Sequence, residues 1–354
     1  MRLGRHMPTG SKPVQALETA REIGCDAIQI FVTNPQAWAP PAPNPDQEQA
    51  FRARATELGW PVVVHAAYII NLASPRDDVY ARSISLLATT MDRAARYGAS
   101  DVVFHIGSHT GSGEEAGLTR LAEGLAQVLD KSDAPVRLLL ENDTGGGGKL
   151  GYRLENLAVT LDRVPQHADR LGVCIDISHL WGAGFDIGTP VGAARTVDEM
   201  ASVIGLARIP VLHVNDARAP LGSHRDIHER LGEGQMPLAG IEAFLRAPGL
   251  ASTVALLETP IPELAPNRPD WTHERVLMAR ARAVAGLAEL AGSEPPHLSE
   301  TDATRGSEPG HPQETRETHE SGEDEQGNPA VATSVRRTRA RVGVGAKLAT
   351  THEP

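Results

Sequence analysis

The chain has 354 residues, of which 40% are apolar and 22% are charged, and this composition is typical of a soluble globular protein. No apolar run approaches the roughly 20 residues that span a bilayer, and residues 1–20 lack the apolar stretch of a signal peptide, so we expect a cytoplasmic protein without membrane contact. The net charge of −11 argues against a nucleic-acid partner, but bound divalent ions would offset several of these charges, so charge alone does not exclude one.

Residues 1–291 alternate between short β-branched or aliphatic runs and longer amphipathic stretches, which is the pattern of consecutive βα units. We expect strands at residues 1–6, 26–31, 61–65, 101–105, 136–141, 171–176, 211–213 and 253–258. We expect helices at residues 13–23, 46–58, 76–97, 114–130, 154–163, 197–206, 238–245 and 273–290. Eight strands, each followed by a helix, predict an α/β fold of the (β/α)8 TIM-barrel type, and a doubly wound open sheet is the less favoured alternative.

The composition changes after residue 291. Residues 292–354 contain no Phe, Tyr or Trp and only six Leu or Val, which is too little apolar surface to offset the entropy lost on folding. We therefore predict a TIM-barrel catalytic domain over residues 1–291 and a low-complexity, disordered tail over residues 292–354.

Two other features are expected to be structural. Cys25 and Cys174 each lie in an apolar run, so we expect both to be buried, without a disulfide or a metal. The four glycines at 145–148 precede Lys149 and superficially resemble a phosphate-binding loop. Because Asp143 stands where that motif needs a glycine and Leu150 where it needs Ser or Thr, we interpret the segment as a flexible loop.

Six of the predicted strands end in residues that bind metal ions or transfer protons. They are His65, His105, Glu141, Asp176, His213 and Glu258. In a TIM barrel the C-terminal ends of the strands meet at the face that carries the active site, so these side chains should converge. Any one of them could be a core histidine or a solvated carboxylate, but six such strand ends together are improbable by chance.

Three further candidates lie close to these positions. His179 follows Asp176 by three residues, and Asp226 and His228 would share one side of an extended segment. Nitrogen and oxygen ligands without thiolates favour Zn²⁺, with Mn²⁺ or Fe²⁺ possible at some positions. Because nine ligands exceed the needs of one ion, the set predicts three metal ions per chain, which would attract a phosphodiester.

The segments that carry these residues resemble the endonuclease IV family of abasic-site endonucleases. They read HAAYIINL (65–72), FHIGSH (104–109), LENDTGGGG (140–148), GVCIDISH (172–179), HVNDAR (213–218), DIHERLGEG (226–234) and LLET (256–259). The resemblance covers roughly residues 1–291, and each of the family's nine metal ligands has a matching residue here.

The resemblance implies a ligand assignment for each of three ions. His65, His105 and Glu141 would hold the first; Glu141 would bridge to a second, held also by Asp176, His213 and Glu258; His179, Asp226 and His228 would hold the third. A hydroxide between two ions would then attack the phosphorus on the 5′ side of an abasic site in double-stranded DNA and leave a 3′-OH. Glu141 is the catalytic residue in this scheme, and the family resemblance also suggests a monomer.

The resemblance implies DNA contacts as well. Tyr68 and Ile69 match a loop that the family inserts into the groove, and Arg218 is a candidate for a phosphate contact. Gln36 stands where the family has an arginine that helps to displace the damaged nucleotide. Replacing that arginine removes a cation and its stacking plane, so we expect altered base flipping or substrate preference.

Two other functions remain open from the sequence. Glu141, Asp176, His213 and Glu258 also resemble the ligand quartet of single-metal sugar isomerases and epimerases on the same barrel. A one-metal isomerase, however, has no use for the other five candidate ligands. A non-catalytic DNA-binding module is the second alternative, and the intact ligand set argues against it.

Overall fold

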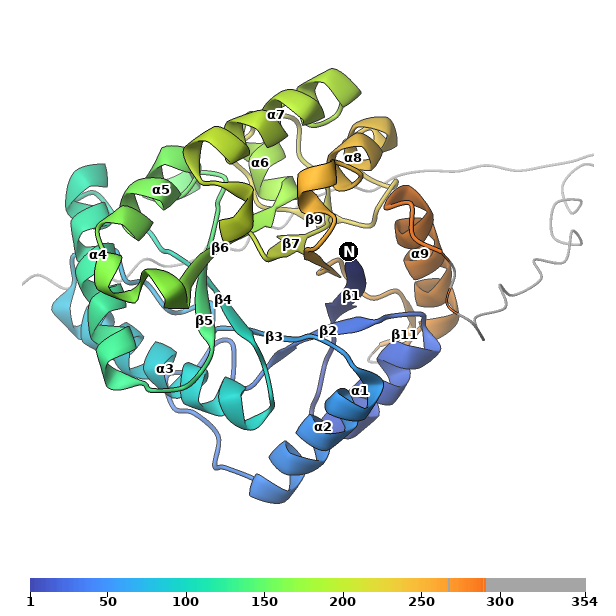
Figure 1. Cartoon of the computed structure of the whole chain (residues 1–354), viewed down its shortest axis with the longest axis horizontal. Helices are drawn as coiled ribbons and strands as arrows, with labels where there is room; N and C mark the ends of the chain where they lie inside the picture. Colours follow the sequence, from blue (N-terminus) through green and yellow to red (C-terminus); the bar gives the residue numbers. More distant parts are fainter. Residues whose placement is uncertain (267, 289, 291–354) are drawn as a thin grey trace, which may run out of the picture. The chain divides into compact units, whose positions relative to one another are not determined.

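The computed structural model describes residues 1–266, 268–288 and 290, and its centre is a closed barrel of eight parallel strands (Figure 1). The strands are β1 (Arg2–His6), β2 (Ala27–Phe31), β3 (Val62–His65), β4 (Asp101–His105), β5 (Arg137–Glu141), β6 (Leu171–Asp176), β7 (Val211–His213) and β10 (Val254–Leu257). They follow chain order around the barrel, and β1 closes it by pairing with β10. The predicted TIM-barrel fold is confirmed.

A helix follows each barrel strand and packs on the outside of the barrel (Figure 1). These helices are α1 (Pro13–Glu22), α2 (Pro45–Leu58), α3 (Asp77–Arg96), α4 (Glu114–Lys131), α5 (Leu154–Asp162), α7 (Pro190–Val203), α8 (Leu238–Leu245) and α9 (Trp271–Val284). Local signals set their ends: the Asn44 side chain accepts a hydrogen bond from the Gln47 amide at the start of α2, and Gly59 ends that helix in the left-handed region.

The apolar interior of the barrel is one layer of small and branched side chains, one from each of seven strands. They are Ala27, Val63, Val103, Leu139, Cys174, Val211 and Leu256. The eighth strand contributes Gly4, where a Cβ atom would overlap the backbone carbonyl of Ala27. A larger apolar core fills the space between the barrel and the helices. Cys25 and Cys174 are both buried and free, as the sequence predicts.

Several elements differ from the prediction. Helix α7 begins at Pro190 rather than near residue 197, because Thr189 caps it and Pro190 occupies its first turn. The short helix α6 (Ile177–Ala183) and two small hairpins, β8 (Asp216–Ala217) with β9 (His228–Glu229) and β11 (Glu263–Ala265) with β12 (Arg268–Pro269), were not predicted. Elements of two to seven residues are too short to show a hydrophobic period.

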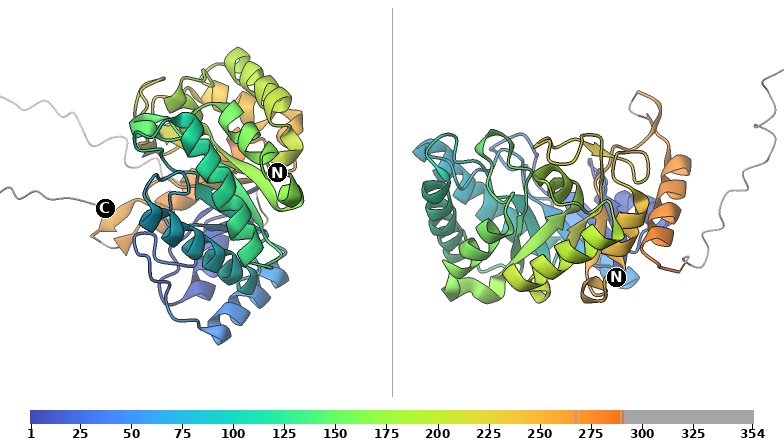
Figure 2. Two further views of the ribbon diagram at one scale, coloured as in Figure 1. Left: turned by 90° about the vertical axis from the view of Figure 1, so that its left-hand side faces the viewer. Right: turned by 90° about the horizontal axis from the view of Figure 1, so that it is seen from above.

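The C-terminal ends of the barrel strands lie on the face opposite to the N-terminus. In the right-hand view of Figure 2 the N-terminus is at the bottom, and the long yellow loop between β7 and α8 lies at the top. Within the described part of the chain, no helix is both long and apolar enough to cross a membrane. The predicted tail, 292–354, lies outside the described residues, so the predicted domain boundary remains a prediction.

Candidate metal centre

A ring of polar side chains lies directly above the apolar layer of the barrel. Because side chains two residues apart on a strand point to the same side, the residue two positions beyond each apolar one also points inward. From β1 to β10 these inward residues are His6, Gln29, His65, His105, Glu141, Asp176, His213 and Glu258. Six of the eight are the strand-end candidates named from the sequence. The alternation of the strands therefore brings them to one end of the barrel.

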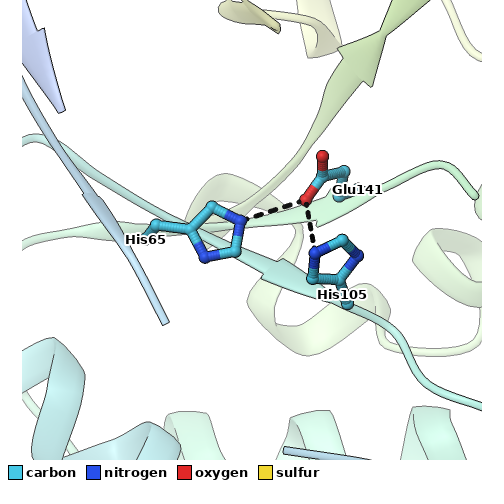
Figure 3. Close-up of side chains that lie close together, drawn as sticks. All are labelled: His65, His105 and Glu141. Atoms are coloured by element: carbon cyan, nitrogen blue, oxygen red, sulfur yellow. Dashed lines mark hydrogen bonds and ion pairs between the residues drawn. The ribbon is translucent and has the colours of Figure 1, made fainter. Parts of the chain in front are cut away.

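Glu141 lies at the centre of this ring and is completely buried. Figure 3 shows the rings of His65 and His105 pointing toward the same carboxylate oxygen, with Nε2 to Oε2 distances of 3.3 and 3.7 Å. The other oxygen, Oε1, lies 2.8 Å from Nδ1 of His213. The ligand atoms of His65, His105 and Glu141 all lie within 4.8 Å of one another, which is close enough to share one ion.

A second group uses the other side of Glu141. Donor atoms of Glu141, Asp176, His213 and Glu258 also lie within 4.8 Å of one another. His213 Nδ1 is 3.1 Å from Glu258 Oε2 and 3.9 Å from Asp176 Oδ2. Glu141 thus belongs to both groups, as a carboxylate that bridges two ions would.

The third group is assembled by two elements that the sequence did not predict. Asp176 caps helix α6, whose first turn places His179 beside the ring, and the β8–β9 hairpin brings His228 over it. Asp226 Oδ1 lies 3.3 Å from His179 Nε2 and 3.2 Å from His228 Nε2. Asp176 is also close: its Oδ2 is 3.4 Å from His228 Nε2. Ligand atoms of Asp176, His179 and His228 all lie within 4.8 Å of one another.

Opposite charges outweigh the effect of burial on the pKa of several candidate ligands, Glu141 and His179 among them. Burial alone would raise the pKa of Glu141, but His105 and His213 hold it well below its ordinary range. Burial alone would lower the pKa of His179, but the carboxylate of Asp176 helps to raise it well above that of free imidazole. Without a metal, protons on the imidazoles thus compensate the carboxylates, and these are the protons that metal binding displaces.

The donor atoms are arranged to bind metal ions rather than to hydrogen-bond with one another. Within the described part of the chain, the buried atoms Nδ1 of His105, Nε2 of His179 and Nε2 of His228 make no hydrogen bond. Buried polar atoms are normally hydrogen-bonded, whereas the nitrogens of His179 and His228 face one carboxylate oxygen of Asp226 at 3.3 and 3.2 Å, an arrangement that fits a shared metal ion. The donors are imidazole nitrogens and carboxylate oxygens without thiolates, which suits Zn²⁺ and less specifically Mn²⁺ or Fe²⁺.

Three amide side chains, none of them predicted from the sequence, orient the candidate ligands. Gln29 lies 3.0 Å from His213 Nε2 and donates to Glu258 at 2.5 Å. Asn215 donates to Asp176 Oδ2 and accepts from the backbone of Glu258, both at 2.8 Å. Asn142 pairs with the backbone of Asp176 in both directions. The position of Gln29, two residues after Ala27, is the signal that could have identified it.

A cavity of about 750 Å³ opens above the cluster. His105, Asp226, His228 and Glu258 are among the residues that line it, together with Tyr68, Ile69 and Trp38 from the loops after β2 and β3. The side chain of Tyr68 is 54% exposed, and its ring lies 5.5 Å from that of His65. An exposed aromatic residue beside the cluster is well placed to contact a substrate.

The remaining two predicted DNA contacts lie outside the residues that line this cavity. Gln36 is exposed on the loop after β2, next to Pro35, whose carbonyl accepts a hydrogen bond from the Tyr68 amide. Arg218 is 63% exposed and pairs with Glu229 at 2.7 Å across the β8–β9 hairpin. Both residues therefore lie outside the lining of the cavity, on segments next to it.

Comparisons with known proteins agree with this architecture. Residues 17–282 match the sequence profile of the family described as "Xylose isomerase-like TIM barrel". The chain is 35% identical over 290 residues to a "Probable endonuclease 4" of Chloroflexus aurantiacus, covering 81% of this chain and 99% of that relative. The crystal structure of endonuclease IV from Thermus thermophilus matches with a TM-score of 0.69 and 33% identity, over 81% of this chain and 99% of that one.

More distant structures share only the fold. D-psicose 3-epimerase from Clostridium cellulolyticum H10 matches with a TM-score of 0.60 but 16% identity, over 80% of this chain and 99% of that one. At that identity the likeness extends to the barrel alone. The matches at higher identity span nearly the full length of their partners. The chain therefore belongs to the endonuclease IV family of the xylose isomerase-like TIM barrels.

Proposed function

We propose that this protein is a metal-dependent DNA repair endonuclease that hydrolyses the phosphodiester 5′ to abasic sites in double-stranded DNA and leaves a 3′-OH. The observation that carries the proposal is the convergence of nine imidazole and carboxylate side chains at one end of the barrel, in groups that share Glu141 and Asp176. Membership of a family whose relatives are described as endonuclease 4 supports the same reaction.

The proposed site holds three Zn²⁺ ions, with Mn²⁺ or Fe²⁺ acceptable at some positions. His65, His105 and Glu141 would hold the first, and Glu141, Asp176, His213 and Glu258 the second. His179, Asp226 and His228 would hold the third, and Asp176 lies close enough to contribute. Such ions supply positive charge for the phosphate oxygens and make a water molecule more acidic.

The protein's other side chains orient this set and receive the DNA. Gln29 orients the side chains of His213 and Glu258, and Asn215 orients that of Asp176, through the hydrogen bonds described above. Tyr68 and Ile69, on the cavity rim, would occupy the space left by the missing base. Gln36 would border the same groove without the charge that its family counterpart brings.

Cleavage of a duplex that contains one abasic site tests the proposal. The purified protein should cut this duplex at the abasic position and leave a 3′-OH end that a DNA polymerase extends. It should leave the undamaged duplex intact, and a chelator should abolish cutting until divalent ions are restored. Absence of cleavage by metal-saturated protein would overturn the proposal.

A single-metal sugar isomerase or epimerase is the alternative, because Glu141, Asp176, His213 and Glu258 form a complete group by themselves. The five additional donors argue against it, since three of their nitrogens are buried without hydrogen bonds in the described structure. Metal analysis separates the two functions. One ion per chain would favour the isomerase, and three would favour the nuclease.

A further inference from the structure

One cation stands among the acidic and aromatic side chains around the cavity. Of the described residues that line it, Lys149 is the only lysine or arginine, while Asp143, Asp226 and Glu258 contribute carboxylates. A phosphodiester that enters this space before it meets the metal cluster would otherwise face negative charge. Lys149 follows the four glycines whose resemblance to a phosphate-binding loop fails on motif grounds.

The backbone of Lys149 is fixed by the neighbouring loop. Lys149 forms an antiparallel bridge with Ser108, in the loop that follows β4. On either side of it, the Gly148 carbonyl accepts from the amide of His109, and the Leu150 amide donates to Gly107. The Cα position at the cavity wall is therefore set by hydrogen bonds, although the loop before it is rich in glycine.

The side chain of Lys149 extends between two carboxylates and stays accessible. Its Nζ lies 3.0 Å from Asp143 Oδ2 and 3.9 Å from Asp226 Oδ2, and the side chain is 37% exposed. Asp143 is shared, because its Oδ2 is also 3.8 Å from Nδ1 of His105. A half-exposed ammonium held by a shared carboxylate can turn toward an incoming anion at small cost.

We propose that Lys149 binds a non-bridging oxygen of a DNA backbone phosphate as the strand enters the cavity. This inference rests on the proposed function, because it takes DNA as the substrate, but it assigns a contact that the metal cluster itself does not make. Asp143, whose Oδ2 lies 3.0 Å from Nζ, holds the ammonium in place before binding and releases it to the phosphate. An ammonium is a point charge that does not read sequence, so the contact should add affinity at any base sequence.

The test compares Lys149→Gln and Lys149→Arg with the control Lys131→Gln in metal-loaded protein. Lys131 is the exposed last residue of α4, close to the start of β5 at the opposite end of the barrel. The dissociation constant for a nicked product duplex is measured by fluorescence anisotropy from about 50 to 200 mM salt. Lys149→Gln should weaken binding about tenfold and make the salt dependence shallower by about 0.9 in log–log slope. Lys149→Arg and Lys131→Gln should keep the wild-type slope.

A double variant separates phosphate binding from simple neutralisation of Asp143. If Lys149 only neutralises that carboxylate, Asp143→Asn combined with Lys149→Gln should restore wild-type affinity, and this result would overturn the inference. Unchanged affinity and slope in Lys149→Gln, or loss of bound metal from that variant, would overturn it equally. None of these measurements requires cleavage, so wild-type protein that binds DNA but fails to cut an abasic site would count against the proposed function and not against this contact.

Discussion

Glu141 is the residue on which the candidate site depends most. It is completely buried, and its two oxygens lie 2.8 Å from His213 and 3.3 Å from His65. A neutral amide has nearly the same shape but supplies only one oxygen and no charge. It would therefore fill the space without joining two ions.

We expect Glu141→Gln to keep the fold and to lower the rate of abasic-site cleavage at least about 100-fold, because the ions that would balance charge on the reacting phosphate are no longer held together. Circular dichroism checks the fold, and single-turnover kinetics measure the rate. Glu123→Gln, at an exposed position on α4, is the matched control and should cleave like the wild type. Near-native activity of Glu141→Gln would contradict the role assigned to this residue.

Asn215 offers a test of the side chains that orient the ligands. Its amide satisfies Asp176 Oδ2 and the backbone of Glu258 at once, in a fully buried position. Asn215→Ala leaves both groups unpaired, so we expect a stability loss of about 1–3 kcal/mol in urea unfolding. Metal affinity should fall about 10- to 100-fold in a competition titration with a chelating dye. A variant with unchanged metal affinity would show that the amide is structural only.

All nine candidate ligands were named from the sequence, but the amides around them were not. His, Asp and Glu at strand ends predict a metal site because they are the side chains that bind metals. Gln29 and Asn215 are ordinary surface residue types; the strand alternation after Ala27 points to Gln29, but only the folded structure places Asn215 beside Glu258. The same limit applies to Lys149, whose place over the cavity depends on its bridge to Ser108.

At the scale of elements, the β8–β9 hairpin and the loop after it deliver His228 to the cluster. The carboxylate of Asp216, in β8, accepts hydrogen bonds from four backbone amides, those of Ala217, Gly232, Gly234 and Met236. One buried side chain thus holds the whole segment in place. Because these four partners are backbone amides, no pattern of residue types in the sequence could predict that Asp216 binds them.

Asp216→Asn tests this anchoring role. An amide offers one acceptor oxygen in place of two, so about half of the four backbone amides lose their partner, at a cost of about 1–3 kcal/mol each. We expect a lower melting temperature and the loss of one ion per chain in metal analysis, since His228 depends on the hairpin. Retention of every ion would show that the hairpin keeps its position without Asp216.

The larger elements were predictable because each repeats a simple pattern. The barrel strands begin and end within one residue of their expected positions, since short apolar runs mark most of these buried parallel strands, although not β1. The predicted start of helix α7 was wrong because its first turn, which follows Thr189 and contains Pro190, carries capping signals rather than an apolar stripe. Helix α6 was missed because seven residues give no period to detect.

At the scale of the whole molecule, the predicted separation of residues 1–291 from the segment 292–354 can be tested by truncation. A chain that ends at residue 291 should keep the melting temperature of the full chain within about 2 °C, because the barrel contains its own apolar core. Abasic-site cleavage should also be retained. A large loss of stability in the truncated chain would contradict the predicted domain organisation.

The proposed function requires that a barrel of this family cuts DNA with three metal ions rather than rearranging a sugar with one. The most direct measurement adds Zn²⁺ stepwise to chelator-treated protein and follows, in the same samples, bound ions per chain and the rate of abasic-site cleavage. We predict that cleavage stays low until the third equivalent binds and then rises to its maximum. Maximal cleavage with one ion per chain, or no cleavage when every site is filled, would contradict the claim.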